Sequence, residues 1–406
     1  MDMERNYRKK YISSLLIIGL FINSAFGQNL LSKSDFIKVD FDRLAINKAK
    51  LLSNDKSLLP AYNQLIKDAK KALKYLPVSV MDKTDVPPSG NKHDYMSIGP
   101  YWWPNPNKPG GVPYIKKDGE VNPEVRNYPD KENLPKLCEN LYTLTLAYYY
   151  SKEEKYADHA SKLLSVWFLD TATCMNPNLK FGQAVKGVNE GRAEGLIETR
   201  HFVYMIDAIK MLEGSKSWSK ANNDQMKVWF SKFLNWLNTS DIGKKEMNAK
   251  NNHGVWFDAQ SLSLALFVDS TQMANQIVVR ALDRLDKQMD NDGFFPLELE
   301  RTTALHYSVF ILNAFELIAD LSTQTNTNFW TAQTKSGKTF KKAIEAMMPY
   351  MTNEKKWTGK QIKEYDYSDG YTLMLRAYYH YDCKDCIEAI KKLIKEDTAK
   401  HLFNLL

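Results

Sequence analysis

The sequence lacks the marks of several protein classes. It has no block of Lys and Arg with interleaved aromatic residues, so we expect no nucleic-acid partner. Beyond its N-terminal region, no run is long and apolar enough to span a membrane. It has only four cysteines and no second Cys-x-x-Cys pair that could complete a metal site. We therefore expect no metal or cofactor, and we interpret the cysteines as structural: Cys138, Cys174, Cys383 and Cys386.

Regular strand alternation and strict internal repeats are also missing. Apolar residues recur instead at helical spacing, and short breaks with Gly, Asn, Asp or Pro separate the segments. Helices joined by short loops pair as antiparallel hairpins, which build either an open solenoid or a closed toroid. The absence of a repeat argues against a solenoid, so we predict an all-α barrel of helical hairpins with a cavity at one end. We expect its helices at residues 57–75, 134–150, 153–169, 196–213, 220–238, 253–269, 271–289, 303–322, 336–352, 368–381 and 384–395.

The first residues have the pattern of a secretory signal peptide. Basic residues between positions 5 and 10 precede an apolar run at 12–22, and small residues follow up to Gly27. No cysteine follows the expected cleavage site, so a lipoprotein anchor is not indicated. We expect residues 1–27 to be removed and residues 28–406 to form one domain, exported to the periplasm or the medium without a membrane anchor. The sequence carries no signal for an oligomeric state.

One segment, from Val86 to Pro135, interrupts the helical pattern. It is rich in Pro, Gly, Asn and aromatic residues, and a loop of this length inside a domain is usually functional or disordered. The aromatic residues make disorder unlikely. We interpret the segment as an ordered wall on which sugar rings can stack, although two of its tryptophans could simply plug one end of the barrel. The aromatic candidates for this wall are Tyr95, Tyr101, Trp102 and Trp103.

Two predicted helix starts carry the chemistry. Asn251-Asn252-His253 precedes one apolar helix, and Arg301 and Tyr307 open another about fifty residues later. An amide, an imidazole and a guanidinium can neutralise a sugar carboxylate, and each well-placed donor contributes about 3–4 kcal/mol to such a transition state. A phenol or an imidazole can then move the proton beside that carboxylate, which contributes about 10²–10⁴-fold. This set suits β-elimination of a uronic-acid polymer.

Each of these residues also has a purely structural interpretation. Asn251 or Asn252 could be a helix cap, Arg301 could pair with a neighbouring glutamate, and Tyr307 could be a core aromatic. His306 is more typical of a packed or solvent-facing neighbour than of a catalyst. Four further residues are weaker candidates for an anionic cleft or for orienting the imidazole of His253: Arg192, Arg200, His201 and Glu246.

Three motifs in this order make the chain recognisable. His93-Asp-Tyr-Met-Ser-Ile-Gly-Pro-Tyr-Trp-Trp-Pro-Asn-Pro106, Asn251-Asn-His253 and Ala304-Leu-His-Tyr307 together resemble the alginate lyase family of helical-toroid polysaccharide lyases. The resemblance runs from about residue 85 to 380. It implies a single, incomplete (α/α) toroid and metal-independent β-elimination on an acidic polysaccharide, with the aromatic loop over the cleft.

The resemblance also implies roles for individual residues. By match, Asn252 and His253 would neutralise the substrate carboxylate with support from Arg301, Tyr307 would be base, acid or both, and Tyr95 would lie in the loop over the cleft. With mannuronate, H5 and O4 lie on one face, so Tyr307 could serve as both base and acid. With glucuronate they lie on opposite faces, and His253 would more plausibly be the base.

Two other functions stay open at this point. A glycoside hydrolase on a similar toroid needs two carboxylates facing each other across the cleft, and none of the candidates pairs convincingly by sequence. These candidates are Asp94, Glu190, Asp258 and Glu298. A non-catalytic carbohydrate-binding protein would use the same aromatic wall. The net charge of +7 fits attraction of a polyanion, but many proteins with neutral ligands carry a similar charge.

Overall fold

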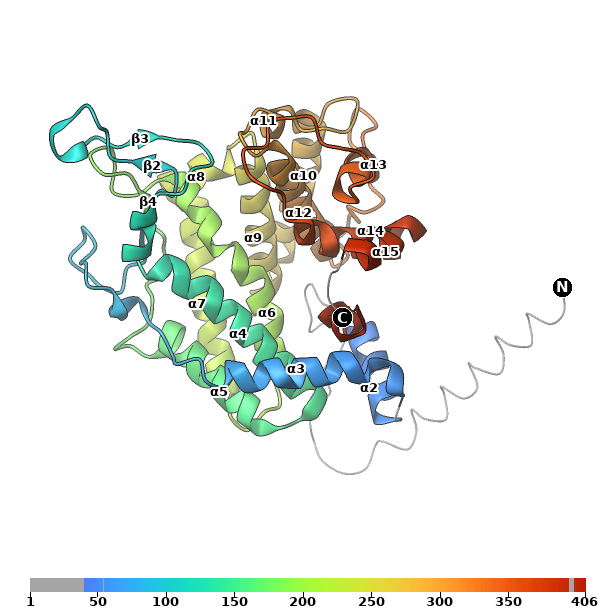
Figure 1. The fold of residues 1–406 in the computed structure, drawn as a ribbon. Coiled ribbons are helices and arrows are strands. Elements are labelled where there is room, and N and C mark those ends of the chain that lie inside the picture. Colours follow the sequence, from blue (N-terminus) through green and yellow to red (C-terminus); the bar gives the residue numbers. More distant parts are fainter. Residues whose placement is uncertain (1–39, 54, 394–397) are drawn as a thin grey trace. The chain divides into compact units, whose positions relative to one another are not determined.

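Helices of residues 32–406 alternate along the chain between an inner and an outer layer (Figure 1). The computed structural model describes residues 40–53, 55–393 and 398–406, so the predicted signal peptide lies outside the described residues. The inner helices are α4 (Asp130–Ser151), α6 (Phe202–Met211), α9 (Asn252–Phe267), α12 (Ala304–Ser322) and α14 (Tyr371–Tyr381). The outer helices are α3 (Leu59–Ala72), α5 (Glu154–Leu164), α7 (Lys220–Thr239), α10 (Thr271–Gln288), α13 (Phe340–Met351) and α15 (Lys384–Leu393).

Burial distinguishes the two layers. Nearly every residue of α9 and α12 is buried, whereas α7 and α10 bury only the stripe that faces inward. Among the described residues, α12 is the one helix long and apolar enough to cross a membrane by length and composition, but it is buried inside the fold. Successive inner helices contact each other. Four of them pack against an outer helix beside them in the chain, and α6 meets α7 through the rings of its first residue and of α7. This is the predicted (α/α) toroid, which confirms the fold class.

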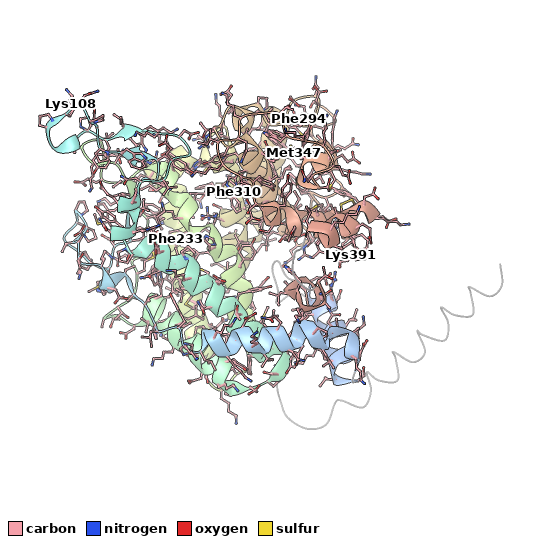
Figure 2. All side chains as sticks on the ribbon, viewed as in Figure 1. Lys108, Phe233, Phe294, Phe310, Met347 and Lys391 are labelled. Carbon is pink, nitrogen blue, oxygen red and sulfur yellow. A yellow bond between two sulfur atoms is a disulfide. The ribbon has the colours of Figure 1, made fainter. Side chains whose placement is uncertain are left out.

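The core between the layers is rich in aromatic rings. The rings pack against each other, mostly edge to face, where α6 meets α7 and the π-helical turn Ser165–Leu169 after α5; they belong to Phe168, Phe202, Trp229, Phe230 and Phe233. Phe233 is labelled in Figure 2 and lies among the packed helices. Such pairs add about 0.5–1.5 kcal/mol each beyond the burial of their area. The aromatic content of the sequence is therefore used largely for packing.

The predicted helices correspond to observed ones, with three omissions and one change of type. Three observed helices were not predicted: α2 (Phe41–Leu52), α8 (Asp241–Met247) and α11 (Pro296–Leu299). The stretch Ala193–His201 is a 3-10 helix rather than the first part of an α-helix. Its charged and polar residues do not repeat on one face, so they give no stripe to bury.

The aromatic segment is ordered and contains short strands. β1 (Met96–Ile98) pairs in parallel with β4 (Phe181–Ala184), and β2 (Trp102–Trp103) pairs antiparallel with β3 (Ile115–Lys116). Lys108 lies at the outer tip of this loop (Figure 2). The loop ends earlier than predicted, because α4 begins at Asp130 and contains Pro135. Buried leucines on both sides of that proline hold the helix together despite the lost hydrogen bond.

The cysteines have structural positions. Cys383 and Cys386 form a disulfide at the junction of α14 and α15. Cys138 is buried in α4 without a disulfide, and Cys174 is a partly buried free thiol. Among the described residues, no group of three His, Cys, Asp or Glu side chains is placed to hold a metal ion.

Candidate active site

A cleft of about 730 Å³ lies where the inner helices begin. Because an outer helix returns the chain after each inner one, the inner helices run in the same direction, and their N-termini gather at the cleft. The loop between residues 86 and 129 adds Tyr101 and Trp102 to the wall. The residues contributed by the helix starts are Lys131 of α4, Arg200 and His201 ahead of α6, Asn252 and His253 of α9, His306 and Tyr307 of α12, and Asp369 and Thr372 beside the start of α14.

Tyr307 is held on three sides. It lies in the first turn of α12, where its backbone N–H donates to the carbonyl of Thr303. Its hydroxyl is 3.0 Å from the hydroxyl of Tyr101, and the Arg301 guanidinium carbon lies 3.6 Å from the centre of its ring. Burial and the neighbouring Tyr101 raise the pKa of Tyr307 well above its usual value, and Arg301 opposes that shift. Tyr307 is therefore a neutral phenol beside a fixed cation.

Arg301 is anchored by a residue that the sequence analysis did not single out. Its Nε and Nη2 donate to the two carboxylate oxygens of Asp118 at 3.1 and 2.7 Å. Burial alone would raise the pKa of Asp118, but the hydrogen bonds and the charge of Arg301 lower it to about 2. The expected alternative, a salt bridge to an adjacent glutamate, is not the observed partner. Asp118 comes from the aromatic loop, so Arg301 joins that loop to the start of α12.

His253 is oriented by Glu246. Its Nδ1 lies 2.6 Å from a carboxylate oxygen of Glu246, which is almost fully buried at the end of α8. Since Nδ1 faces this carboxylate, Nε2 is the ring nitrogen left for the cleft. The side chain of Asn251 caps α9 by accepting from the backbone N–H of His253 at 3.3 Å. The helix cap expected for Asn251 and the orienting contact expected for Glu246 therefore both occur.

Asn252 differs from the expectation. Although the residue borders the cleft, its side chain is fully buried, and its Nδ2 donates to Glu298 at 2.7 Å. Its backbone N–H donates to the other carboxylate oxygen of Glu298, also at 2.7 Å. The backbone N–H and one side-chain N–H of Asn252 therefore bind a buried carboxylate from α11, which needs such donors because its charge is removed from water. Of the predicted clamp of Asn252, His253 and Arg301, the last two keep polar atoms for a substrate carboxylate, and Asn251, predicted as a substrate-binding residue, also borders the cleft.

The backbone of the segment before His253 is fixed by hydrogen bonds from α10. Arg284 of α10 donates from Nη1 to the carbonyl of Ala249 at 2.9 Å and from Nη2 to the carbonyl of Met247. Its Nε donates to buried Asp258 at 2.5 Å. Gly254 allows this arrangement, since a Cβ there would lie 2.2 Å from the carbonyl oxygen of Ala249. The first turn of α9 therefore has little freedom to move.

The three weaker cationic candidates all line the cleft. Arg192 donates to the side-chain oxygen of Gln183 at 2.7 Å, and its guanidinium lies 5.8 Å from the ring centre of Trp102. Arg200 donates to the carbonyl of Ile197 at 3.2 Å. Burial lowers the pKa of both guanidinium groups, but arginine keeps its charge at neutral pH. Burial and Arg200 lower the pKa of His201 to about 3, so His201 is a neutral imidazole.

Two members of the predicted aromatic wall lie elsewhere. Tyr95 is fully buried and donates its hydroxyl to Glu198 at 2.9 Å, so it supports the root of the loop instead of covering the cleft. Trp103 donates its indole N–H to the carbonyl of Glu120 at 2.9 Å and does not border the cleft. The alternation of side chains along β2 places Trp102 and Trp103 on opposite faces, so only one of them can face the cleft.

Several cleft residues were missed. Phe310 and Asn313 follow Tyr307 on the same face of α12, and helical spacing from Tyr307 would have found both. Phe310 is labelled in Figure 2. His306 also borders the cleft, where its Nδ1 pairs with Asp369 at 3.0 Å. Asp118 has no signal of this kind, because nothing in the sequence relates that turn to Arg301.

The carboxylates considered for glycoside hydrolysis are engaged in structural contacts. Asp94 accepts from Ser89, Asn176 and Asn178, and Asp258 accepts from Arg280 and Arg284. Neither of the two borders the cleft, and neither does Glu190. Glu298 is bound to Asn252, as described above. These four residues do not form the pair of facing carboxylates that a hydrolase needs.

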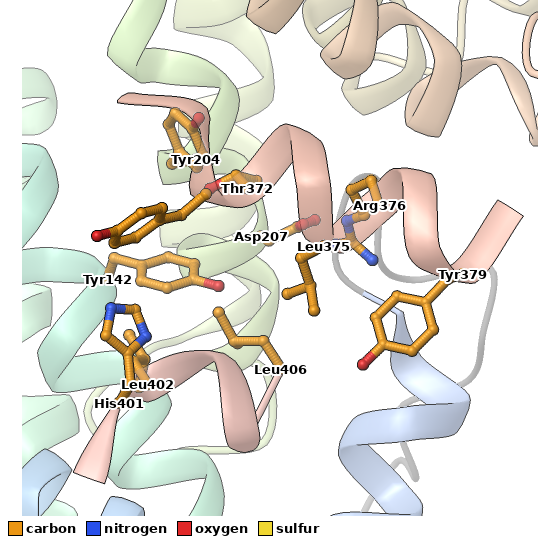
Figure 3. Close-up of a pocket in the computed structure, with 11 residues that line it drawn as sticks. Tyr142, Tyr204, Asp207, Thr372, Leu375, Arg376, Tyr379, His401, Leu402 and Leu406 are labelled. Atoms are coloured by element: carbon orange, nitrogen blue, oxygen red, sulfur yellow. The ribbon is translucent and has the colours of Figure 1, made fainter. Parts of the chain in front are cut away.

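A second cavity of about 220 Å³ adjoins the cleft and shares Tyr204 and Thr372 with it (Figure 3). It lies between α4, α6, α14 and the turns formed by residues 398–406, and tyrosine and leucine side chains make up most of its wall. Its arginine, Arg376, is paired with Asp320 at 3.0 Å. This cation is therefore already neutralised within the fold.

Comparisons with known proteins agree with this geometry. The family model described as alginate lyase matches residues 79–357. The chain is similar to the crystal structure of an alginate lyase from Bacteroides ovatus, with 39% identity, 90% of this chain and 96% of that chain covered, and a TM-score of 0.83. No curated protein sequence gives a significant match.

More distant solved structures share the fold. Alginate lyase A1-III from Sphingomonas species A1 is 12% identical, with 88% of this chain and 93% of that chain covered and a TM-score of 0.54. A variant of alginate lyase A1-III complexed with a tetrasaccharide is 13% identical, with 89% and 92% covered and a TM-score of 0.57. At this identity the likeness concerns the fold alone.

Proposed function

Because this chain belongs to the alginate lyase family and is a polysaccharide lyase, we propose that it cleaves alginate or a related polymer of uronic acids by β-elimination. The product would carry a 4,5-unsaturated uronate at its new non-reducing end. The observation that supports this most directly is the meeting of Tyr307, Arg301 and His253 in one cleft, whose lining carries further cationic side chains as well as carboxylates. The tetrasaccharide bound by a relative of the same fold is consistent with an oligosaccharide ligand.

The clamp would make the C5 proton acidic. Elimination begins at the carbon beside the carboxylate, and the charge that develops there spreads onto the carboxylate oxygens. Arg301, His253 and the amide of Asn251 are the donors available for those oxygens, and each contributes about 3–4 kcal/mol if it is aligned with the transition state. Asp118 and Glu246 keep two of these donors in place before substrate arrives.

Tyr307 would move the protons. To act as the base, Tyr307 must first release its phenol proton to water. Burial raises the pKa of Tyr307, so the phenolate is a strong base, and the adjacent Arg301 cation stabilises this anion. On mannuronate, the same hydroxyl could then return its proton to O4 on the same face of the ring. On glucuronate, His253 would be the base and Tyr307 the acid. Substrate stereochemistry therefore determines which residue starts the reaction.

Removal of the Tyr307 hydroxyl tests the proposal. The purified protein should raise the absorbance of unsaturated uronate on at least one of polymannuronate, polyguluronate and glucuronan, and Tyr307→Phe should lower that rate by about 10²–10⁴-fold. Tyr156→Phe is the matched control, because Tyr156 is fully buried on α5 and does not border the cleft. New reducing ends without the chromophore would indicate a hydrolase, and binding without any turnover would exclude an enzyme acting on these polymers.

We also propose that the protein is exported. The support is the basic and apolar pattern of residues 1–27 described above. Expressed in a bacterial host, the full chain should appear in the periplasm or medium with Gln28 as its first residue, as measured by mass spectrometry of the intact protein. A full-length chain that stays in the cytoplasm would contradict this proposal.

A further inference from the structure

The turn at Asp118 is hydrogen-bonded to the residues just before α12, the helix that carries Tyr307. Besides its two bonds to Arg301, the Asp118 carboxylate accepts from the backbone N–H of Thr302 at 3.4 Å and from its hydroxyl at 3.1 Å. The hydroxyl of Thr302 also reaches the carbonyl of Asp118, at 3.1 Å. Gly119 follows with φ +80, and a Cβ there would meet the Thr302 hydroxyl at 2.5 Å. The close approach therefore requires a residue without a side chain.

This contact fixes the plane of the Arg301 guanidinium. Two parallel N–H···O bonds hold it in a bidentate pair, which leaves little rotational freedom. In that plane the guanidinium lies over the ring of Tyr307 at 3.6 Å. The same loop carries Tyr101, whose hydroxyl meets that of Tyr307. One turn therefore sets two of the contacts that Tyr307 makes.

We propose that Asp118 is a positioning residue for the elimination: by holding the Arg301 guanidinium over the ring of Tyr307, it keeps the cation where the phenolate forms. This inference rests on the proposed function. Asp118 borders neither the substrate space nor Tyr307 directly, so its effect passes through Arg301. This role differs from that of a general salt bridge, because loss of Asp118 should then change the pKa of Tyr307.

Two effects of removing Asp118 have opposite signs. A guanidinium that swings away from Tyr307 no longer stabilises the phenolate, so the pKa of Tyr307 rises. A guanidinium that stays in place without its counter-charge stabilises the phenolate more, so that pKa falls. The titratable and charged groups around this pair are Tyr101 and Lys116 from the loop, His306 on α12, Glu298 on α11 and His253 on α9.

The experiment compares Asp118→Asn, Asp118→Ala and Asp118→Glu with the wild type on the most active polyuronate. Asparagine keeps one acceptor and the shape of the side chain, alanine removes the anchor, and glutamate restores the charge. Glu124→Gln is the matched control, since Glu124 forms an ion pair with Lys186 at 2.8 Å in the same loop and does not contact Arg301. Rates are measured across pH for each variant, and melting temperatures report folding.

We expect a rate loss of about 10- to 100-fold in the alanine variant, as for a misplaced catalytic group. The pH limb governed by Tyr307 should shift upward in both Asp118→Asn and Asp118→Ala, with partial recovery in Asp118→Glu. An unshifted limb with a rate equal to that of Glu124→Gln would show a purely structural contact and overturn the proposal. A downward shift would also overturn it. A wild type inactive on every polyuronate would overturn the proposed function, and this proposal with it.

Discussion

Gly254→Ala should disturb the site without altering any polar group. The new Cβ would lie 2.2 Å from the carbonyl oxygen of Ala249 and 2.4 Å from Nη1 of Arg284, so these atoms must move apart by about 1 Å. Overpacking of this kind costs about 1–3 kcal/mol. Loss of the Arg284 bond to that carbonyl adds about 1.5–3 kcal/mol. The higher helix propensity of alanine than of glycine stabilises the fold by about 1 kcal/mol and offsets part of this loss.

The net expectation is a loss of about 2–5 kcal/mol in the free energy of unfolding, measured by urea titration of tryptophan fluorescence. The turnover rate on a polyuronate should fall by about 10²-fold, because His253 moves with the helix start. Gly370→Ala makes the same chemical change where the new Cβ meets its nearest neighbour at an ordinary 3.6 Å. If both variants match the wild type in stability and rate, the close packing behind His253 does not position it.

Two further predictions concern the carboxylates of Glu298 and Asp118. Asn252→Ala should lower the free energy of unfolding by about 1–3 kcal/mol, because Glu298 loses a donor. In a double-mutant cycle measured by urea titration, the variant with both Asn252→Ala and Glu298→Gln should lose less than the sum of the two single losses. Strictly additive losses would contradict the coupling. Pairing with Arg301 lowers the pKa of Asp118 from 3.8 to about 2, so it stabilises the fold above pH 3.8 and this stability is lost as pH falls toward 2. Asp118→Asn should flatten that part of the wild-type stability curve, and an unchanged curve would exclude the linkage.

The sequence predicted the layers of this fold well, because its signal is periodic. Apolar spacing identified the long inner helices, whose burial is nearly complete in α9 and α12. It missed α8 and α11, which are too short to show a period. Glu246 and Glu298 lie on these two short helices, so the omission hid the reason for their burial.

The candidate site was predictable where function follows from position along a helix. His253 and Tyr307 were placed at helix starts by sequence, and the structure brings them into one cleft. Contacts across the loop were not predictable in this way, since Asp118 lies 183 residues from Arg301. Tyr95 and Trp103 were misjudged for a related reason: an aromatic residue in a loop can pack inward, and residue type alone does not tell which way it faces.

The common direction of the inner helices has an electrostatic consequence. Each helix start carries a partial positive charge, because the peptide dipoles along a helix are aligned. Where several starts gather at one end, these fixed dipoles add to the potential that an approaching polyanion meets. This contribution comes from the backbone, so it does not titrate as histidines and carboxylates change charge. The chain can thus attract an acidic polymer over a wide pH range without a strongly basic surface, and substitution of any single side chain would leave most of that attraction in place.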